Sequence, residues 1–245
     1  MIVGFVGSGN MAAAMARGWS GHVDRMLFTD SGSGRAAGLA EEVGGEAVGE
    51  NSELARADVL VLAVKPPMLG DVAMELQDVP AVVSLLGATP LDRVQDAFPH
   101  AEVTRVMPNV AVEVHRGVLC VAGGLSGELR EALGVLGHVV ELPDSQFDAA
   151  TAVMGCSPAY LALAVEAIAS AGTVDGLDSD LARELVVETA AGTAELLREK
   201  HPADVRKAVA SPGGSTEAGL EALEREGGRE AFEAAVRASL EKMRG

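Results

Sequence analysis

The chain has 245 residues, a formal net charge of −17 and two cysteines. This charge argues against a nucleic-acid partner, because a phosphate backbone requires a cationic surface. Cys120 and Cys156 are too few for a disulfide framework or a zinc site, which fits a reducing cytoplasm. The histidines lack the spacing of metal ligands, so we expect no metal; they are His22, His100, His115, His138 and His201.

The first part of the chain alternates strand and helix signals. The apolar run Val3–Val6 predicts a first strand, and a glycine loop and a helix over Met11–Trp19 follow it. Further strands are expected at Arg25–Thr29, Val59–Val64, Ala81–Leu86 and Glu102–Val106, with Val118–Val121 and Val139–Leu142 at the edge. This alternation indicates an α/β fold with a doubly wound, largely parallel sheet of the Rossmann type. We assign residues 1–150 to this dinucleotide-binding domain.

From about Gln146 onward helical periodicity replaces the strand signals, so we expect an all-helical domain over residues 151–245. Asp178-Ser179 is a capping candidate, and apolar or small residues follow it at steps of three and four: Leu181, Leu185, Thr189, Gly192 and Leu196. The last helix repeats that spacing at Phe232, Val236, Leu240 and Met243. Such apolar faces predict pairing with a second copy, in a homodimer or higher homo-oligomer.

No membrane segment is expected. The chain starts with a strand and not with a basic leader, which argues against a signal peptide. The most apolar long stretch, Pro158–Gly172, contains Glu166 and is too short to span a bilayer. These features predict a soluble, cytoplasmic protein.

The loop Gly7-Ser8-Gly9-Asn10-Met11-Ala12 lies between the first strand and the first helix. In that context Gly7 makes the tight turn, Gly9 permits the approach of a pyrophosphate, and Ala12 allows close helix–strand packing. The alternative is an ordinary βα turn. We expect cofactor binding at Gly7, Ser8, Gly9, Asn10 and Met11.

Asp30 ends the second strand, where an acidic side chain holds the adenosine ribose of NADH. Ser31, Ser33 and Arg35 follow at once and suit the 2′-phosphate of NADPH instead. The sequence leaves both cofactors open. Asn51 is also expected to bind the cofactor.

Two further strands end in polar residues at the edge where ligands bind. Ala63-Val64-Lys65-Pro66 closes one of them, and Lys65 either lines the crevice or is a solvated lysine. Asn109 closes the other and either hydrogen-bonds a ligand or caps the turn made by Pro108. We expect Ala63, Val64, Lys65 and Pro66 to bind the cofactor and Asn109 to bind the substrate.

The segment Ser211-Pro212-Gly213-Gly214-Ser215-Thr216 precedes a helical run. Unpaired N–H groups at the start of a helix favour an anion, so this loop suits a small carboxylate. Tyr160 is either a catalytic acid or, as is more common, a packed aromatic residue with a satisfied hydroxyl. Cys156 has no histidine partner and is interpreted as structural.

In order, five motifs resemble the pyrroline-5-carboxylate reductase family: Gly7–Ala12, Ala63–Pro66, Arg105–Asn109, Ser157–Tyr160 and Ser211–Thr216. The resemblance implies a Rossmann domain, a helical dimerisation domain and a cytoplasmic enzyme that makes L-proline with NADH or NADPH. It also implies that the amides of Gly214, Ser215 and Thr216 bind the substrate carboxylate. Thr216 would then hydrogen-bond the ring nitrogen, and Ser211 would support the loop.

Two alternatives stay open at this stage. One is a relative that reduces another imine or a 3-hydroxy acid, although Lys200 and Lys207 lie in no supporting motif. The other is a non-catalytic nucleotide-binding regulator. Departures from the family at Ser84–Ala88, Val110-Ala111 and Ala208–Ala210 are the support for that second alternative.

Overall fold

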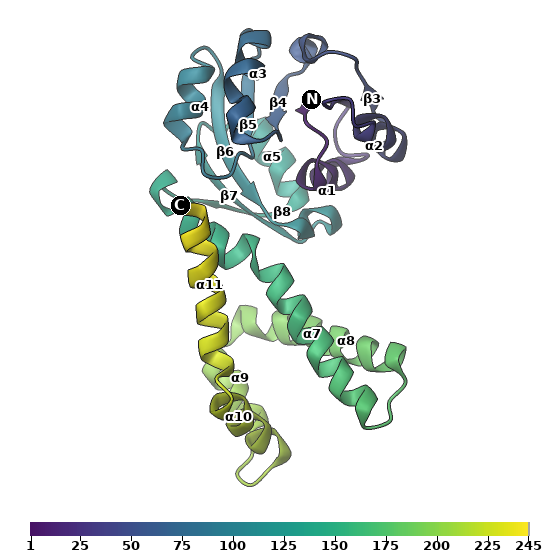
Figure 1. Cartoon of the computed structure of the whole chain (residues 1–245), viewed down its shortest axis with the longest axis vertical. Coiled ribbons are helices and arrows are strands. Elements are labelled where there is room, and N and C mark those ends of the chain that lie inside the picture. Colours follow the sequence, from purple (N-terminus) through teal and green to yellow (C-terminus); the bar gives the residue numbers. More distant parts are fainter. Residues whose placement is uncertain (245) are drawn as a thin grey trace. The chain divides into compact units, whose positions relative to one another are not determined.

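The computed structural model describes residues 1–244, which divide into two compact units (Figure 1). The first contains Met1–Cys156 and the C-terminal residues from Leu240 on, and the second is Ser157–Ser239.

Within the described residues of the first unit, eight strands form one sheet in the order β3-β2-β1-β4-β5-β6-β7-β8. Their bounds are β1 Ile2–Val6, β2 Arg25–Thr29, β3 Glu46–Ala47, β4 Val59–Leu62, β5 Ala81–Ser84, β6 Glu102–Pro108, β7 Gly117–Gly123 and β8 Gly137–Glu141. All neighbouring strands are parallel except β6 and β7. The doubly wound, largely parallel sheet is therefore confirmed. β3 was not predicted, since it has two residues and begins with a glutamate.

Helices cover both faces of this sheet. Those of the first unit are α1 Asn10–Trp19, α2 Arg35–Val43, α3 Leu69–Glu75, α4 Leu91–Ala97, α5 Gly127–Leu136 and α6 Phe147–Ala150. Short helical turns join them: η1 Asn51–Arg56, η2 Pro66–Met68, η3 Val110–Val114, η4 Asp144–Gln146 and η5 Thr151–Gly155.

Alternate residues of a strand point to opposite faces of the sheet, and two separate apolar cores follow from this alternation. Phe5 and Val61 pack in one core with α1, α2 and α5. Leu60 and Leu62 pack in the other with α3 and α4. Burial on both faces is what the continuous apolar run of β4 predicted.

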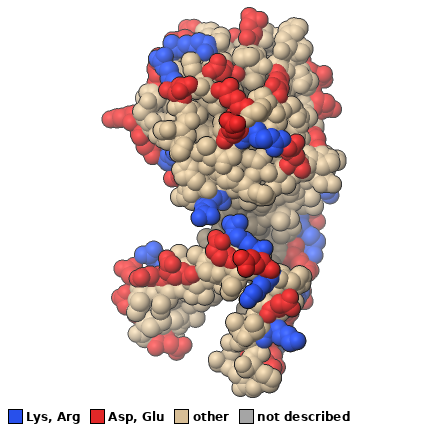
Figure 2. All heavy atoms as spheres, turned by 180° about the vertical axis from the view of Figure 1, so that it is seen from behind, with Lys and Arg blue, Asp and Glu red and all other residues tan. Residues whose placement is uncertain are grey.

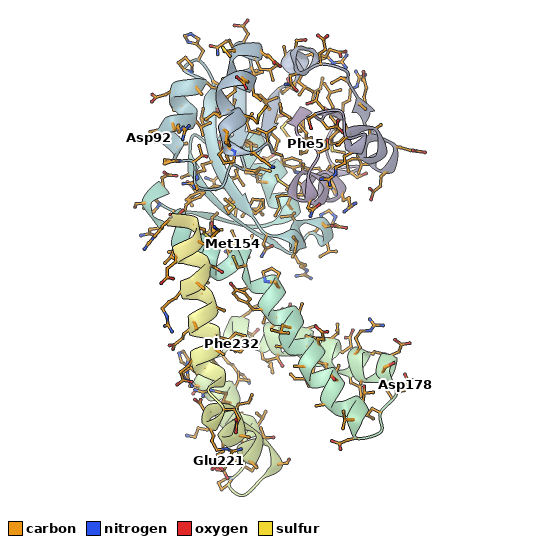
Figure 3. The ribbon with its side chains drawn as sticks, in the orientation of Figure 1. Phe5, Asp92, Met154, Asp178, Glu221 and Phe232 are labelled. Atoms are coloured by element: carbon orange, nitrogen blue, oxygen red, sulfur yellow. The ribbon has the colours of Figure 1, made fainter. Side chains whose placement is uncertain are left out.

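Aromatic side chains form the centre of the first core. Phe5, labelled in Figure 3, stacks on Phe28 with ring centroids 5.0 Å apart, and Trp19 lies 6.0 Å from Phe5. The indole Nε1 of Trp19 donates to the carbonyl oxygen of Ala132 at 2.7 Å, so its polar atom is satisfied. This packing fixes α1 against β1 and so fixes the loop between them.

The second unit is helical, with α7 Ser157–Val174, α8 Ser179–Glu199, α9 Pro202–Val209, α10 Ser215–Arg225 and α11 Gly228–Arg244, the last of which continues into the first unit. Asp178 lies in the turn between α7 and α8 (Figure 3), and its carboxylate accepts the N–H groups of Asp180 and Leu181 at 3.0 and 3.1 Å. The predicted cap of α8 is thereby confirmed.

The expectation that the apolar stretch Pro158–Gly172 is too short to span a bilayer needs correction. This stretch belongs to a helical run, Asp144–Val174, that has 31 residues and joins η4, α6, η5 and α7. Its most apolar window has a mean hydropathy of 1.6 and is 6% buried, and by length and composition it is long enough to cross a membrane. The start of helical structure near Gln146 agrees with the predicted change from strands to helices, since α6 begins at Phe147.

Candidate active site

A cavity of ≈ 520 Å³ opens in the first unit where β1, β2 and β4 end. The chain leaves β1 and β4 toward opposite sides of the sheet, which makes this a topological switch point, the usual place for a dinucleotide in such folds. The lining residues are Val6, Gly7, Ser8, Gly9, Thr29, Asp30, Ser31, Ser33, Arg35, Asn51, Ala63, Val64, Lys65, Met68 and Val72.

Most of the expected cofactor-binding residues meet in this cavity, and three do not line it. Those brought together are Gly7, Ser8, Gly9, Asp30, Ser31, Arg35, Asn51, Ala63, Val64 and Lys65. Asn10 and Met11 instead form the first turn of α1, and Pro66 begins η2. Sequence reasoning missed the apolar wall made by Met68 and Val72, since nothing in the local pattern separates these side chains from ordinary core residues.

The glycine loop has the geometry that a pyrophosphate needs. Gly7 has a φ of +93°, and a Cβ there would lie 2.6 Å from the carbonyl oxygen of Ala63. A Cβ on Gly9 would meet no atom within 4 Å, so this backbone faces open space. Gly9 caps α1 without a side-chain hydrogen bond, which leaves the first N–H groups of the helix for an anion. The residues therefore fit a dinucleotide.

Ser8 contributes to this loop by anchoring it. Its side chain is buried, and its hydroxyl donates to the carbonyl oxygen of Thr29 at 3.1 Å. The amide of Gly7 donates to the same oxygen at 3.1 Å. Two hydrogen bonds thus tie the loop after β1 to the end of β2, which holds the cavity floor in place.

Asp30 organises its own loop. One carboxylate oxygen accepts the N–H groups of Gly32 and Ser33 at 2.7 and 3.0 Å. The other accepts the Ser33 hydroxyl at 3.1 Å and the Ala36 N–H at 2.8 Å. The Ala36 N–H, followed by those of Gly32 and Ser33, lowers the pKa of the Asp30 carboxyl. Its four acceptor positions are therefore occupied within the loop.

Asn51 is held in a short hydrogen-bonded chain across the cavity rim. Its Oδ1 accepts the Thr29 hydroxyl at 2.8 Å, and its Nδ2 donates to Glu75 at 2.8 Å. A second hollow of ≈ 430 Å³ adjoins the cavity here, lined by Asp30, Gly49, Glu50, Asn51, Ser52 and Glu75.

In the described part of the chain, no group of three or more His, Cys, Asp or Glu side chains is placed to hold a metal ion.

Asn109 has structural hydrogen bonds to both sides. Its Oδ1 accepts the Val118 N–H and its Nδ2 donates to the carbonyl oxygen of Met154, each at 3.2 Å. The side chain is buried. The side chain makes no cap hydrogen bond at the turn after Pro108, so it joins the backbone of Val118 to that of Met154 instead. Its expected contact with substrate stays a prediction.

The other candidate anion site lies in the second unit. Gly213 has a φ of +74°, Gly214 caps α10 with no side-chain hydrogen bond, and Ser215 and Thr216 are the first helical residues, as predicted. Both Ser215 and Thr216 are exposed. An uncapped helix N-terminus leaves their N–H groups without intrahelical partners.

Two amides of this loop have partners inside it. The Gly214 N–H donates to the carbonyl oxygen of Ser211 at 2.9 Å, and the Gly213 N–H donates to the Glu217 carboxylate at 2.6 Å. The sequence-based expectation that the Gly214 amide binds a carboxylate therefore needs correction: this amide closes the turn, while Ser211 supports the loop through its carbonyl.

Tyr160 has a satisfied hydroxyl. It hydrogen-bonds the Ser239 hydroxyl at 2.5 Å and lies 3.3 Å from the carbonyl oxygen of Ala235. This favours a packed aromatic residue over a catalytic acid.

Both cysteines are free thiols, and burial raises the pKa of Cys120.

Comparison with known proteins assigns both units. Residues 144–245 match the family model for pyrroline-5-carboxylate reductase dimerisation, and residues 2–87 match the NADP oxidoreductase, coenzyme F420-dependent model. A pyrroline-5-carboxylate reductase of Synechocystis sp. is 40% identical over 202 residues, which cover 78% of this chain and 76% of the relative. That of Pisum sativum is 33% identical, over 99% of this chain and 94% of the relative. The chain belongs to the pyrroline-5-carboxylate reductase family.

Solved structures agree with this assignment. The pyrroline-5-carboxylate reductase of Streptococcus pyogenes has a TM-score of 0.89 at 28% identity and covers 99% of this chain and 98% of its own. The pyrroline carboxylate reductase of Plasmodium falciparum, with NADP bound, has a TM-score of 0.87 at 25% identity. The match covers 99% of this chain and 97% of that chain. A Mycobacterium tuberculosis 3-hydroxyisobutyrate dehydrogenase, at 19% identity and a TM-score of 0.52, shares the fold alone. The resemblance stated from the motifs is confirmed, and the protein is an NAD(P)H-dependent oxidoreductase.

Proposed function

We propose that this chain reduces the carbon–nitrogen double bond of 1-pyrroline-5-carboxylate and so makes L-proline. The observation that carries the proposal is the pair of glycine-containing loops that lead into α1 and α10. α1 follows a bare glycine loop at the cavity, and α10 follows the Ser-Pro-Gly-Gly turn. Family membership supports the assignment of the first to the cofactor and of the second to a small acid.

The two parts of the chain take separate roles in this proposal. Residues 1–150 bind the dinucleotide, with Lys65 and the loops after β1, β2 and β4 around it. Residues 151–245 bind the substrate and the second copy of the chain. The glycine loop and the first turn of α1, including Asn10 and Met11, hold the pyrophosphate through backbone N–H groups.

The substrate carboxylate binds the N–H groups of Ser215 and Thr216, while the Gly214 and Ser211 pair keeps the turn closed. The Thr216 hydroxyl hydrogen-bonds the ring nitrogen and orients the imine. A protonated imine is already electrophilic, so the site needs no acid with a strongly shifted pKa. Bound NAD(P)H supplies the hydride.

The assembled enzyme is a soluble, cytoplasmic homodimer or higher homo-oligomer in this account, with a small-molecule substrate and neither nucleic acid nor membrane as partner. The net charge of −17 supports the exclusion of nucleic acid. Figure 2 shows acidic side chains over both units on the visible face, with basic side chains in small separate groups. The dimerisation model that matches residues 144–245 supports the pairing.

The direct test is a spectrophotometric assay of the purified protein with 1-pyrroline-5-carboxylate and either NADH or NADPH, together with a titration of each cofactor alone. We expect substrate-dependent oxidation of the cofactor and formation of L-proline. Tight cofactor binding without turnover on either cofactor would instead identify a non-catalytic nucleotide-binding protein.

A further inference from the structure

Asp30 occupies four donors of the loop after β2, so Ser31 and Arg35, which also line the cavity, are the main donors left there for a phosphate on the adenosine ribose. A 2′-phosphate carries close to two negative charges at neutral pH and needs several hydrogen-bond donors. The N–H groups of Gly32, Ser33 and Ala36 and the Ser33 hydroxyl already donate to Asp30. A phosphate at this loop would have to displace a carboxylate from four hydrogen bonds.

A second carboxylate reaches the same rim from α3. Glu75 accepts the Asn51 Nδ2 at 2.8 Å, and Asn51 accepts the Thr29 hydroxyl at the end of β2. This chain fixes the amide of Asn51 with one donor directed at Glu75 and away from any anion in the cavity. It also holds the Glu75 charge beside a residue that lines both hollows.

The carboxylates around the rim repel an anion and outnumber the basic side chains there. Asp30, Glu50 and Glu75 line the adjoining hollow, whereas Arg35 and Lys65 are the basic residues of the cavity lining. Lys65 follows β4, which pairs with β1 beside the glycine loop, whereas Arg35 begins α2 directly after the Asp30 loop and is the cation opposed by these three carboxylates. A neutral ribose 2′-hydroxyl bears no such electrostatic cost.

We propose that this chain discriminates against the adenosine 2′-phosphate and selects NADH over NADPH, with Asp30 and Glu75 as the discriminating residues. The inference rests on the proposed function only in taking the cavity as the dinucleotide site. Asp30 acts by occupying the donors of its loop, and Glu75 acts through Asn51. The ribose contact predicted for Asp30 is not required.

The experiment is a calorimetric titration of the full-length protein with adenosine 5′-diphosphate and with its 2′-phosphorylated form, at low and high salt. We expect adenosine 5′-diphosphate to bind about tenfold more tightly than its 2′-phosphorylated form at low salt. The ratio of the two dissociation constants should approach one at high salt, because salt screens the exposed carboxylates. Equal or tighter binding of the 2′-phosphorylated ligand to the wild-type protein would overturn the inference.

Two variants test which residues cause this preference. Glu75→Gln should lower the ratio of the two dissociation constants by about two- to fivefold. Asp30→Asn should lower it further, because this change removes a charge and frees hydrogen-bond donors of the loop. Asp71→Asn removes the same charge from α3 at a residue that lines neither hollow. The ratio should not change in this control; a change as large as that in Glu75→Gln would show that net charge alone decides, and would contradict the role of Glu75.

These titrations separate the inference from the proposed function, because neither ligand carries a nicotinamide and no turnover is needed. If the protein reduces 1-pyrroline-5-carboxylate equally well with both cofactors and binds both ligands alike, the proposed function is supported and the inference is contradicted. If it prefers the unphosphorylated ligand but has no reductase activity, the inference is supported and the proposed function is contradicted.

Discussion

Thr216 is the residue on which the proposed chemistry depends most. It is exposed at the start of α10, with its N–H outside the helical hydrogen-bond pattern. Thr216→Ala should lower kcat roughly ten- to a thousandfold, the range of a lost polar contact in a transition state. Steady-state kinetics measure the effect. Thr173→Ala is the matched control, because the Thr173 hydroxyl donates to Ala169 within its own helix. Equal rates in the two variants would remove Thr216 from the mechanism.

Gly7 combines a backbone requirement with a steric one. Gly7→Ala should lower cofactor affinity and destabilise the fold by about 1–3 kcal/mol, since the φ of +93° is strained for alanine and the new Cβ would lie 2.6 Å from the Ala63 carbonyl oxygen. Gly21→Ala is the control, with a φ of +77° but no atom within 4 Å of the new Cβ. Thermal melts and cofactor titrations should show loss of binding in Gly7→Ala only. Similar affinity in both variants would contradict the assigned close approach.

Asp30 also predicts a dependence of stability on pH. The hydrogen bonds from Ala36, Gly32 and Ser33 lower its folded-state pKa below the unfolded value of about 3.9. Its contribution to stability is therefore present above that unfolded value and is lost as pH falls through the folded pKa. Thermal melts across this range should show wild type more stable than Asp30→Asn near neutral pH, with the difference shrinking in acid. A difference independent of pH would exclude the charge as its source.

At the scale of elements, α8 depends on its cap. The Asp178 carboxylate accepts two N–H groups at the helix start. Asp178→Ala should therefore cost about 1 kcal/mol of unfolding free energy, measured by urea denaturation. Asp180→Ala is the control in the first turn, because its carboxylate makes only an exposed ion pair with Arg183. Equal losses in the two variants would mean that charge near the helix end matters and that the cap does not.

The elements that the sequence predicted well are those with a strong local pattern. The continuous apolar run of β4 and the cap at Asp178 each specify their structure over a few residues. β3 was not predicted because two residues carry no period, and its pairing with Leu27 and Phe28 of β2 is set by tertiary contacts. The apolar stretch Pro158–Gly172 is shorter than the helical run that contains it, because less apolar turns from Asp144 on belong to the same run.

In the candidate site, too, the sequence predicted some features and not others. Strand ends predicted which loops meet, because the carboxyl ends of parallel strands share one edge of a sheet. Hydrogen-bond partners could not be predicted. The bonds from the Asp30 carboxylate to its own loop, from Asn51 to Glu75 and from the Gly214 amide to Ser211 depend on backbone geometry that residue types alone do not specify.

At the scale of the whole molecule, the second unit exposes large apolar side chains. Leu161, Leu163 and Ile168 of α7 are 60–65% exposed, and Leu185 of α8 is 50% exposed. Large apolar side chains left this exposed on two neighbouring helices are typical of an association site in a soluble protein. Residues 144–245 match the dimerisation family model, so we expect a second copy of the chain to cover these side chains.

Sedimentation of the wild-type protein should therefore give at least twice the mass of one chain. Leu185→Glu should raise the dissociation constant at least about tenfold, because a charge at an apolar interface is costly to desolvate. Met74→Glu is the control, at a side chain that is 75% exposed in the first unit. A monomeric wild type, or equal dissociation in both variants, would contradict the assignment of this face.

In the proposed reaction, hydride passes from the reduced nicotinamide cofactor to the imine carbon of a small cyclic acid. The most direct measurement supplies 1-pyrroline-5-carboxylate and a reduced nicotinamide cofactor deuterated at the hydride position, and analyses the product by mass spectrometry. We expect L-proline that carries one deuterium, on the ring carbon beside nitrogen that bears no carboxylate. Oxidation of the cofactor without labelled proline, or no oxidation while the cofactor binds, would contradict the account.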